Sequence, residues 1–267
     1  MKYSPAPPES SGVRAFWDRT GEHLPPFFDA PSTEFYRDCE IRLFETYFPD
    51  LKGKRIFKTD LWDEAKNTRI LAWADERGAE VFGIDISPTI VRVARRSFTA
   101  RGHRPGLAVS DLRFISASTG AFDFLYSMGT IEHFREYRMA LAECFRVLKP
   151  GGRAVIGVPN RFDPFLRPAL VGVLNLAGRY AYGFEKSFSW RSLERMLTGA
   201  GFRVLDRTGI LFIPGWLRML DLYVHVRNRR SNAWMRPFVA PFAALSRRYP
   251  RIGRYGYLIA GVVEKPK

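Results

Sequence analysis

From residue 53 onward, short apolar runs alternate with amphipathic stretches, and this alternation predicts an α/β fold. The apolar runs contain five to eight residues and read as strands: "RIFKT" (55–59), "EVFGIDIS" (80–87), "LAVSDL" (107–112), "FDFLYSM" (122–128) and "RAVIGVPN" (153–160). The first, second and fourth runs are typical of strands buried on both faces of a parallel sheet. Strands separated by helix-length segments indicate βαβ units with right-handed crossovers.

The segments between these strands have the apolar spacing of helices. They are "TRILAWADERGA", "SPTIVRVARRSFTARG" and "REYRMALAECFRVLKPGG". We expect Ser87 to cap the second helix, with Pro88 in its first turn, and the third helix to end at Gly151 and Gly152. A helix over "SWRSLERMLTGAGF" precedes two further strands, "RVLDRTGILF" and "YGYLIAGVVEK". The sequence therefore predicts a Rossmann-like, mostly parallel sheet of seven strands with helices on both faces.

Three segments lie outside this alternation and define the expected domain organisation. Residues 1–52 read as a Pro/Ser-rich tail followed by an aromatic-rich helical cap. Residues 161–186 are an aromatic and aliphatic insertion that we interpret as a lid. Residues 212–255 form a basic amphipathic insertion before the last strand. The core is then expected to comprise residues 53–211 and 256–267.

The net charge of +15 is concentrated in the insertion before the last strand. Between residues 212 and 256 there are nine arginines and one acid, Asp221, which leaves a net charge of +8. Basic, aromatic-rich amphipathic helices can lie on a membrane or hold a phosphorylated, lipid-like acceptor. A capping subdomain with a solvated arginine face is the alternative. Nucleic acid is disfavoured as a partner, because no RNA-binding module is recognisable.

Neither the cysteines nor the apolar runs indicate another class of protein. Cys39 and Cys144 lie far apart without a CxxC pattern or a neighbouring histidine cluster, so we expect neither a metal site nor a disulfide. No signal-peptide pattern is visible, and no apolar run approaches the ~20 residues of a membrane span. We therefore expect a cytoplasmic protein, with peripheral membrane association as a further interpretation of the basic insertion.

Acids at strand ends are the first indication of chemistry. Asp85 is at the end of the second strand, where a carboxylate can accept hydrogen bonds from both hydroxyls of a ribose. Asp111 closes the third strand, where it can accept a hydrogen bond from an adenine amino group. Either acid alone is as well explained by a turn or a helix cap. Together, at regular βαβ spacing, they favour a nucleoside site.

At this point the chain resembles the class I S-adenosylmethionine-dependent methyltransferases. The resemblance covers about residues 53–202 and the last strand, and the matching segments are "GIDIS", "SDLRF", "FDFLYSMGTIEHF", "FRVLKPGGRAVIGVPN" and "FSWRSLERMLTGAGF". It implies S-adenosylmethionine as the cofactor. It also implies that Asp85 holds the ribose, Ile86 lines the adenine slot, Asp111 and Leu112 meet the adenine edge, and Ser127, Met128 and Gly129 lie against the methionine half.

The first motif departs from the family, which has a Gly-x-Gly loop after the first strand. Here the chain reads "KTDLWDEAKN" (58–67), without glycine. In one interpretation Thr59, Asp60, Asp63, Glu64 and Asn67 replace backbone contacts by side-chain contacts, and Asp60 faces the cofactor's ammonium group. In the other, the site has lost its cofactor and the acids only cap the next helix. We favour the first, because Asp85 and Asp111 remain in place.

The acceptor end of the expected site follows the fourth strand. Glu132 and His133 lie just past the methyl-bearing end, and His133 is the best candidate for a catalytic base. The pair can also be a helix cap or help to hold a metal. Asn160, at the end of the fifth strand, is expected to border the acceptor with Glu132 and His133. The predicted function is methylation, most readily on oxygen, of a small apolar or lipid-linked acceptor. The alternative is a non-catalytic protein of this fold that binds an anionic partner through its basic insertion.

Overall fold

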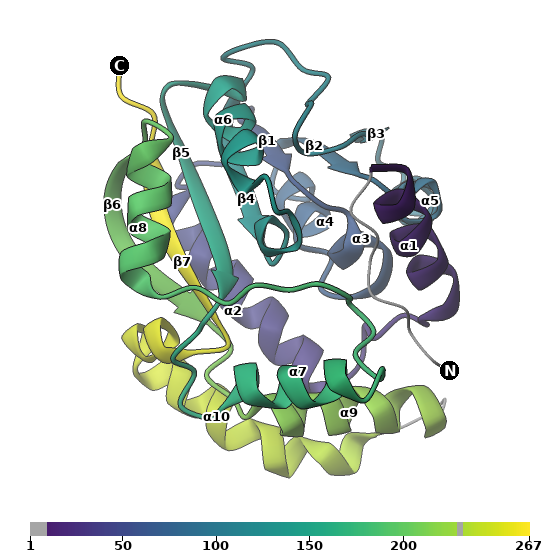
Figure 1. Cartoon of the computed structure of the whole chain (residues 1–267). Helices are drawn as coiled ribbons and strands as arrows, with labels where there is room; N and C mark the ends of the chain where they lie inside the picture. Colours follow the sequence, from purple (N-terminus) through teal and green to yellow (C-terminus); the bar gives the residue numbers. More distant parts are fainter. Residues whose placement is uncertain (1–9, 229–231) are drawn as a thin grey trace.

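Figure 1 shows the computed structural model, which describes residues 10–228 and 232–267. A seven-stranded sheet forms the centre of the molecule. The strand order is β3-β2-β1-β4-β5-β7-β6. Strands β1 to β5 pair in parallel, and β7 runs antiparallel between β5 and β6. The bounds are β1 (Arg55–Lys58), β2 (Glu80–Asp85), β3 (Gly106–Val109), β4 (Phe122–Met128), β5 (Leu148–Pro159), β6 (Arg203–Ile210) and β7 (Leu258–Glu264). The predicted mostly parallel, Rossmann-like sheet is confirmed.

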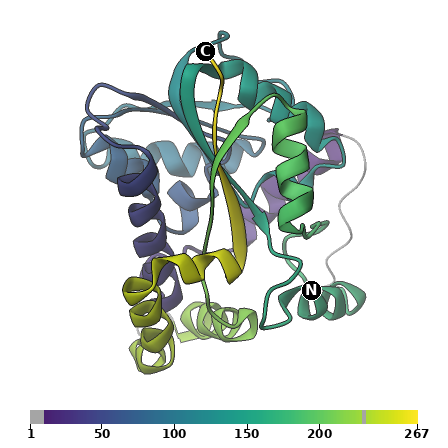
Figure 2. The same ribbon diagram turned by 90° about the vertical axis from the view of Figure 1, so that its left-hand side faces the viewer.

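Helices cover both faces of the sheet, and two separate apolar cores fill the layers between them. Figure 2 shows α2 (Pro31–Tyr47) and α8 (Trp190–Gly199) on opposite sides of the strands. Side chains of α2, α4 (Ile70–Asp75) and α5 (Pro88–Thr99) form one core with residues of the sheet. Side chains of α6 (Tyr137–Val147) and α8 form the other. The sheet is therefore buried on both faces, as the apolar runs predicted.

The predicted ends of the third helix and the third strand were wrong, and one cap is confirmed. The helix expected to end at Gly151 is α6, which stops at Val147, because Leu148 already pairs with Phe122 at the start of β5. The strand expected over residues 107–112 is β3, which ends at Val109. The Ser87 hydroxyl accepts a hydrogen bond from the backbone N–H of Ile90 at 3.2 Å, so it caps α5 as expected.

The N-terminal cap consists of α1 (Ser10–His23) and α2. Helix α1 is fixed to the start of α5, because the Asp18 carboxylate accepts hydrogen bonds from the Ser87 hydroxyl at 2.6 Å and the Thr89 backbone N–H at 2.9 Å. The expected Pro/Ser-rich tail falls largely on residues 1–9, which lie outside the described residues. The helical part of the prediction is confirmed.

The basic insertion contains two helices, α9 (Gly215–Asn228) and α10 (Arg236–Arg248), with short 3-10 turns η2 (Ala233–Met235) and η3 (Pro250–Tyr255). Asp221 of α9 is fully buried and accepts hydrogen bonds from the Ser32 backbone N–H at 2.8 Å and the Asn232 side chain at 2.5 Å. The Arg218 guanidinium donates to the Ser32 carbonyl at 2.9 Å. The insertion is thus attached to the first turn of α2. Arg229 and Arg230, part of the predicted basic block, lie outside the described residues.

Helix α7 (Arg167–Leu176) lies within the segment interpreted as a lid. Figures 1 and 2 both show α7, α9 and α10 together at the lower end of the molecule. Within the described ranges, no helix is long and apolar enough to cross a membrane. Cys39 and Cys144 are buried and unpaired.

Candidate functional site

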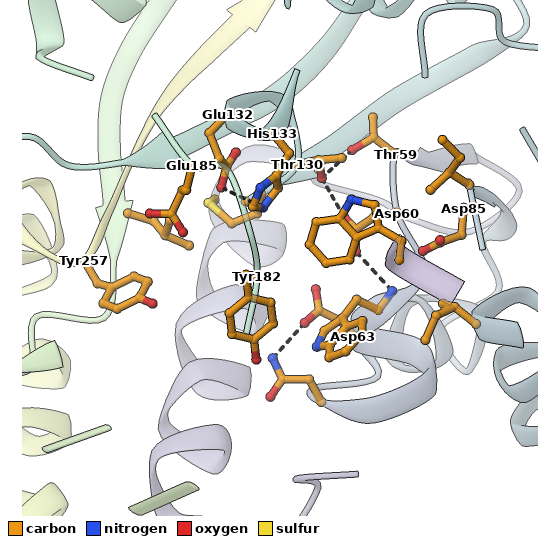
Figure 3. Close-up of a pocket in the computed structure, with 18 of the residues that line it drawn as sticks. Thr59, Asp60, Asp63, Asp85, Thr130, Glu132, His133, Tyr182, Glu185 and Tyr257 are labelled. Carbon is orange, nitrogen blue, oxygen red and sulfur yellow. Dashed lines mark hydrogen bonds and ion pairs between the residues drawn. The ribbon is translucent and has the colours of Figure 1, made fainter. Parts of the chain in front are cut away.

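A cavity opens beyond the carboxyl ends of β1, β2 and β4, where the strand order reverses. Figure 3 shows Asp60 and Asp85 toward one end of the cavity and Glu132, Glu185 and Tyr257 toward the other. Its walls include most of the residues predicted from the sequence: Thr59, Asp60, Asp63, Asn67, Asp85, Ile86, Leu112, Met128, Gly129, Glu132 and His133. Elements far apart in the sequence thus converge on one space.

Asp85, at the end of β2, is held by two backbone groups. Its Oδ2 accepts a hydrogen bond from Leu61 N–H at 3.0 Å, and its Oδ1 accepts one from Ser87 N–H at 2.8 Å. Each carboxylate oxygen keeps a further lone pair for a ligand. Burial raises the pKa of Asp85 to about 7, against the effect of these hydrogen bonds. The geometry therefore leaves this carboxyl group able to accept hydrogen bonds from two ligand hydroxyls.

Asp111 is not part of the cavity wall, although it was predicted to meet the adenine edge. The Arg113 guanidinium binds its carboxylate, with Nη2 2.7 Å from Oδ2 and Nε 3.0 Å from Oδ1. Ser110 and Leu112, its two neighbours in the chain, do line the cavity. The pairing with Arg113 fixes the turn after β3, and Leu112 is the predicted adenine neighbour that reaches the space.

The glycine-free segment is organised by Lys58, the last residue of β1, whose side chain is fully buried. Its Nζ lies 2.9 Å from Asp60 Oδ1 and 2.9 Å from Asp63 Oδ2. Burial opposes the charge on Lys58, but the combined attraction of the surrounding acids, Asp60 and Asp63 first among them, outweighs it, so the pKa of Lys58 is raised. When both acids are ionised, one ammonium faces two carboxylates. The cluster then carries one uncompensated negative charge, and both acids line the cavity.

Hydroxyl groups link this cluster to the end of β4. The Thr130 hydroxyl donates to Asp60 Oδ2 at 2.8 Å, and Thr59 Oγ1 lies 2.8 Å from Ser127 Oγ. Ser127 is buried and, unlike the prediction, does not line the cavity. Its observed contact instead fixes Thr59, which does.

The glycine-free segment contains a short helix, α3 (Trp62–Lys66), which begins two residues after Asp60. The first residue after β1 with positive φ is Arg69, so this backbone does not need the conformational freedom of glycine. Glu64 was expected beside the cofactor but lies outside the cavity wall. Its carboxylate accepts hydrogen bonds from Leu71 N–H at 2.8 Å and Ala72 N–H at 3.4 Å, so it caps α4.

His133 ends the 3-10 turn η1 (Ile131–His133), which follows β4. Its Nδ1 lies 2.7 Å from the Phe184 carbonyl oxygen. Because a carbonyl can only accept, Nδ1 carries the proton and Nε2 has the free lone pair. Burial lowers the pKa of His133, which favours the neutral ring. The ring is therefore in the form that a base requires.

Glu132 is almost completely buried, and its Oε2 has no hydrogen-bond partner among the described residues. Its Oε1 is 4.0 Å from His133 Nε2. Burial, and then the nearby charge of Glu185, raise the pKa of Glu132 well above its usual range. A neutral carboxyl group can donate as well as accept a hydrogen bond. Among the described residues, no cluster of three His, Cys, Asp or Glu side chains is arranged to hold a metal ion.

The sequence analysis missed a buried ion pair between Arg167 and Glu185 at the acceptor end. The guanidinium binds both carboxylate oxygens, at 2.5 and 2.8 Å, and it lies 3.9 Å from the ring centre of Tyr257. Tyr180 also donates to Glu185. All four residues line the cavity, as does Arg218 of the insertion. Their separation in the sequence gave no signal that they meet.

Asn160, predicted to border the acceptor, is not in the cavity wall. Its side-chain amide donates to the Gly256 carbonyl at 3.0 Å, and its carbonyl oxygen accepts from Phe162 N–H at 2.9 Å. The amide donor therefore joins the end of β5 to the segment before β7, and the carbonyl oxygen holds the turn that follows β5.

Comparisons with known proteins agree with this geometry. The sequence family described as "Methyltransferase domain" matches residues 64–156. Ubiquinone biosynthesis O-methyltransferase of Mesorhizobium japonicum is 31% identical over 159 residues, which cover 55% of this chain and 62% of that protein, less than two thirds of its length. The protein of the same name from Thiobacillus denitrificans is 31% identical over 194 residues, covering 69% of this chain and 81% of that one.

A solved structure shares the fold over nearly the whole length. Burkholderia thailandensis 1,6-didemethyltoxoflavin-N1-methyltransferase, solved with 1,6-didemethyltoxoflavin and S-adenosylhomocysteine, superposes with a TM-score of 0.58 at 14% identity. The match covers 100% of this chain and 94% of that one.

The raised pKa values predict how stability depends on pH. Asp85 and Glu64 have folded pKa values of about 7, above the ~4 of the unfolded chain, so the folded state retains protons that the unfolded state has lost. Their contribution to stability is therefore lost as the pH rises from about 4 through about 7. We expect Asp85→Asn to flatten this decrease, whatever its absolute stability. Urea unfolding of the ligand-free proteins at several pH values measures the free energy of unfolding. An equal dependence of this free energy on pH in the two proteins would contradict a raised pKa of Asp85.

Proposed function

Because the chain belongs to the class I S-adenosylmethionine-dependent methyltransferases, we propose that it transfers a methyl group from this cofactor to a hydroxyl oxygen of a small, apolar or lipid-linked acceptor. The observation that carries the proposal is that one cavity has both a cofactor end and an acceptor end. One end has the Asp85 carboxyl group, and the other has the free Nε2 of His133.

The cavity residues fit the parts of the cofactor. Asp85 can bind the ribose hydroxyls, and Ile86 and Leu112 offer apolar contacts to the adenine. The uncompensated charge of the Lys58, Asp60 and Asp63 cluster suits an ammonium group. Met128 and Gly129, at the carboxyl end of β4, also line the cavity. When bound, S-adenosylmethionine supplies an activated methyl group, so the protein's main task is alignment.

His133 and Glu132 act on the acceptor in this proposal. The hydroxyl proton passes to Nε2 of His133, while Nδ1 stays bonded to the Phe184 carbonyl and keeps the ring oriented. Glu132, held neutral by burial, can donate to or accept from an acceptor oxygen through its unpartnered Oε2. The remaining wall includes Leu211, Met219, Leu222, Tyr182 and Tyr257, which suits an apolar or aromatic acceptor. The O-methyltransferase names of the relatives support oxygen as the attacked atom.

The first prediction from this proposal concerns cofactor binding. We expect the protein to bind S-adenosylhomocysteine, and Asp85→Ala to weaken binding at least about tenfold, since a lost carboxylate leaves two ribose hydroxyls without partners. Calorimetric titration measures this, with Asp123→Ala as the matched control because Asp123 lies near the start of β4, outside the cavity wall. Undiminished affinity in folded Asp85→Ala would exclude its ribose role. Absence of binding by the unaltered protein would favour the non-catalytic alternative.

The second prediction concerns the base. With methyl-labelled cofactor and a lipid extract as the source of acceptors, we expect label to enter the organic phase. His133→Gln, which keeps a hydrogen-bonding side chain but no base, should slow transfer by about 10²–10⁴-fold. Its affinity for S-adenosylhomocysteine should stay within about twofold. Unchanged transfer by His133→Gln would assign this residue to packing rather than proton removal.

The helices at the lower end of the molecule carry a set of exposed large apolar side chains. Figure 1 shows the helices α7, α9 and α10 that carry it. We call it the interfacial face; its members are the exposed large apolar side chains of these helices and of η2: Val173, Leu176, Trp216, Leu220, Tyr223, Val226, Trp234 and Phe238. Trp216 is 56% exposed and Leu176 92%. Amphipathic helices with aromatic side chains can insert such a face into a lipid surface.

The charge around the interfacial face is smaller than the sequence indicated. Arg236 binds Glu34, Arg247 binds Asp38 and Arg254 binds Asp206, each across an element boundary. Arg218 is buried in the cavity wall. Arg227, Arg248 and Arg251 remain without an acidic partner among the described residues and can attract an anionic surface. A lipid-linked acceptor held in a membrane would reach the cavity from this side.

The third prediction tests this surface. We expect the protein to float with phosphatidylglycerol vesicles and much less with phosphatidylcholine vesicles, with the difference reduced at high salt. Replacing Trp216 and Leu220 by serine should reduce recovery several-fold. Phe114→Ser, at an exposed apolar residue near β3, is the control. Equal recovery from both vesicle types would assign the insertion to a solvated capping subdomain.

A further inference from the structure

Carboxyl groups outnumber guanidinium groups in the cavity wall, although the chain as a whole is strongly basic. Five carboxyl groups line it, from Asp60, Asp63, Asp85, Glu132 and Glu185, against the two guanidinium groups of Arg167 and Arg218. The whole chain carries a net charge of +15. Arg167 compensates Glu185, Lys58 compensates one of Asp60 and Asp63, and Glu132 is held neutral, so the positive excess of the rest of the molecule does not extend into the cavity.

Three aromatic side chains from three separate segments meet in this cavity wall. They are Trp17 of α1, Trp62 of α3 and Tyr182, which follows α7; we call them the aromatic wall. The ring centres are 6.3 Å apart for Trp17 and Trp62, 5.8 Å for Trp62 and Tyr182, and 6.4 Å for Trp17 and Tyr182. The two pairs that include Trp62 are edge-to-face. In such a pair only one ring offers its face to the other, so ring faces remain for a ligand.

Trp62 places an indole ring where the family carries glycine. It is two residues beyond Asp60, and its backbone N–H donates to Asp60 Oδ1 at 3.2 Å. The ring is therefore anchored beside the Lys58, Asp60 and Asp63 cluster, next to the ammonium group in the proposed binding mode. The sulfonium of the same cofactor is separated from that ammonium by only a short carbon chain.

We propose that the aromatic wall recognises the positive sulfonium of S-adenosylmethionine through cation–π contacts, and so favours the charged methyl donor over the neutral product. The inference rests on the proposed function. The negative face of an aromatic ring attracts a cation, most strongly for tryptophan. Methyl transfer removes the positive charge from sulfur, so the product loses this attraction. By binding the charged donor more tightly than the neutral product, the aromatic wall assists the exchange of product for substrate.

The test is the ratio of two dissociation constants, for S-adenosylmethionine and for S-adenosylhomocysteine, measured by calorimetry. Trp62→Leu should shift this ratio against the charged donor by about fivefold, ~1 kcal/mol, while Trp62→Phe should shift it less. Sinefungin carries an ammonium group at the position of the sulfonium. Its affinity should fall in the Trp62→Leu variant as the affinity of the charged donor does. Trp17→Leu should shift the ratio in the same direction, and it serves as the second variant if Trp62→Leu does not fold.

Trp190→Leu is the control, because Trp190 lies on α8 and outside the cavity wall. An unchanged ratio in both Trp62→Leu and Trp17→Leu, with binding of both compounds retained, would overturn the inference and leave the proposed function standing. If the unaltered protein bound neither compound, the proposed function itself would fail. If the substitutions weakened the binding of both compounds equally, the aromatic wall would only pack against the adenosine. That result would also overturn the inference.

Discussion

The ammonium group of Lys58 is the interaction on which the site depends. It is fully buried at the end of β1 and holds Asp60 and Asp63, which flank the start of α3. A buried charge without a partner is strongly destabilising, so removing either side of this cluster would leave the other uncompensated. The position of Trp62, the hydrogen bond from Leu61 to Asp85 and the contact of Thr130 with Asp60 all follow from where this cluster fixes the chain.

Helix α2 extends this organisation to the insertion. Its Glu40 accepts a hydrogen bond from the Tyr126 hydroxyl of β4, on the sheet face where Lys58 also approaches Tyr126. The first turn of α2 binds both Arg218 and Asp221 of α9 through Ser32. The insertion therefore reaches the cavity because it is bonded to a helix that already packs on the sheet. A change at this contact would alter the acceptor end and the interfacial face together.

The sequence predicted the sheet well because its strands are continuous apolar runs, and it placed Asp85 and His133 at the edge of the sheet where the cavity lies, because strand ends in this fold face one edge. It did not find the roles of Lys58, Arg167 or Glu185. Charged residues are ordinarily read as solvent-exposed, and only tertiary contact reveals that these three are buried. For the same reason it assigned Glu64 to the cofactor and Asn160 to the acceptor, whereas backbone groups brought close by folding occupy both side chains.

The glycine-free motif changes how the site is held rather than whether it can form. A glycine loop is flexible and must be ordered, which has an entropic cost. Here the same stretch is a helical turn whose carboxylates are already bonded to Lys58, Asn67 and Thr130. The polar groups are then oriented before a ligand arrives, and less ordering remains for binding. The cost appears instead as buried carboxyl groups with raised pKa values, so the preorganised site is maintained at the expense of the stability of the ligand-free protein.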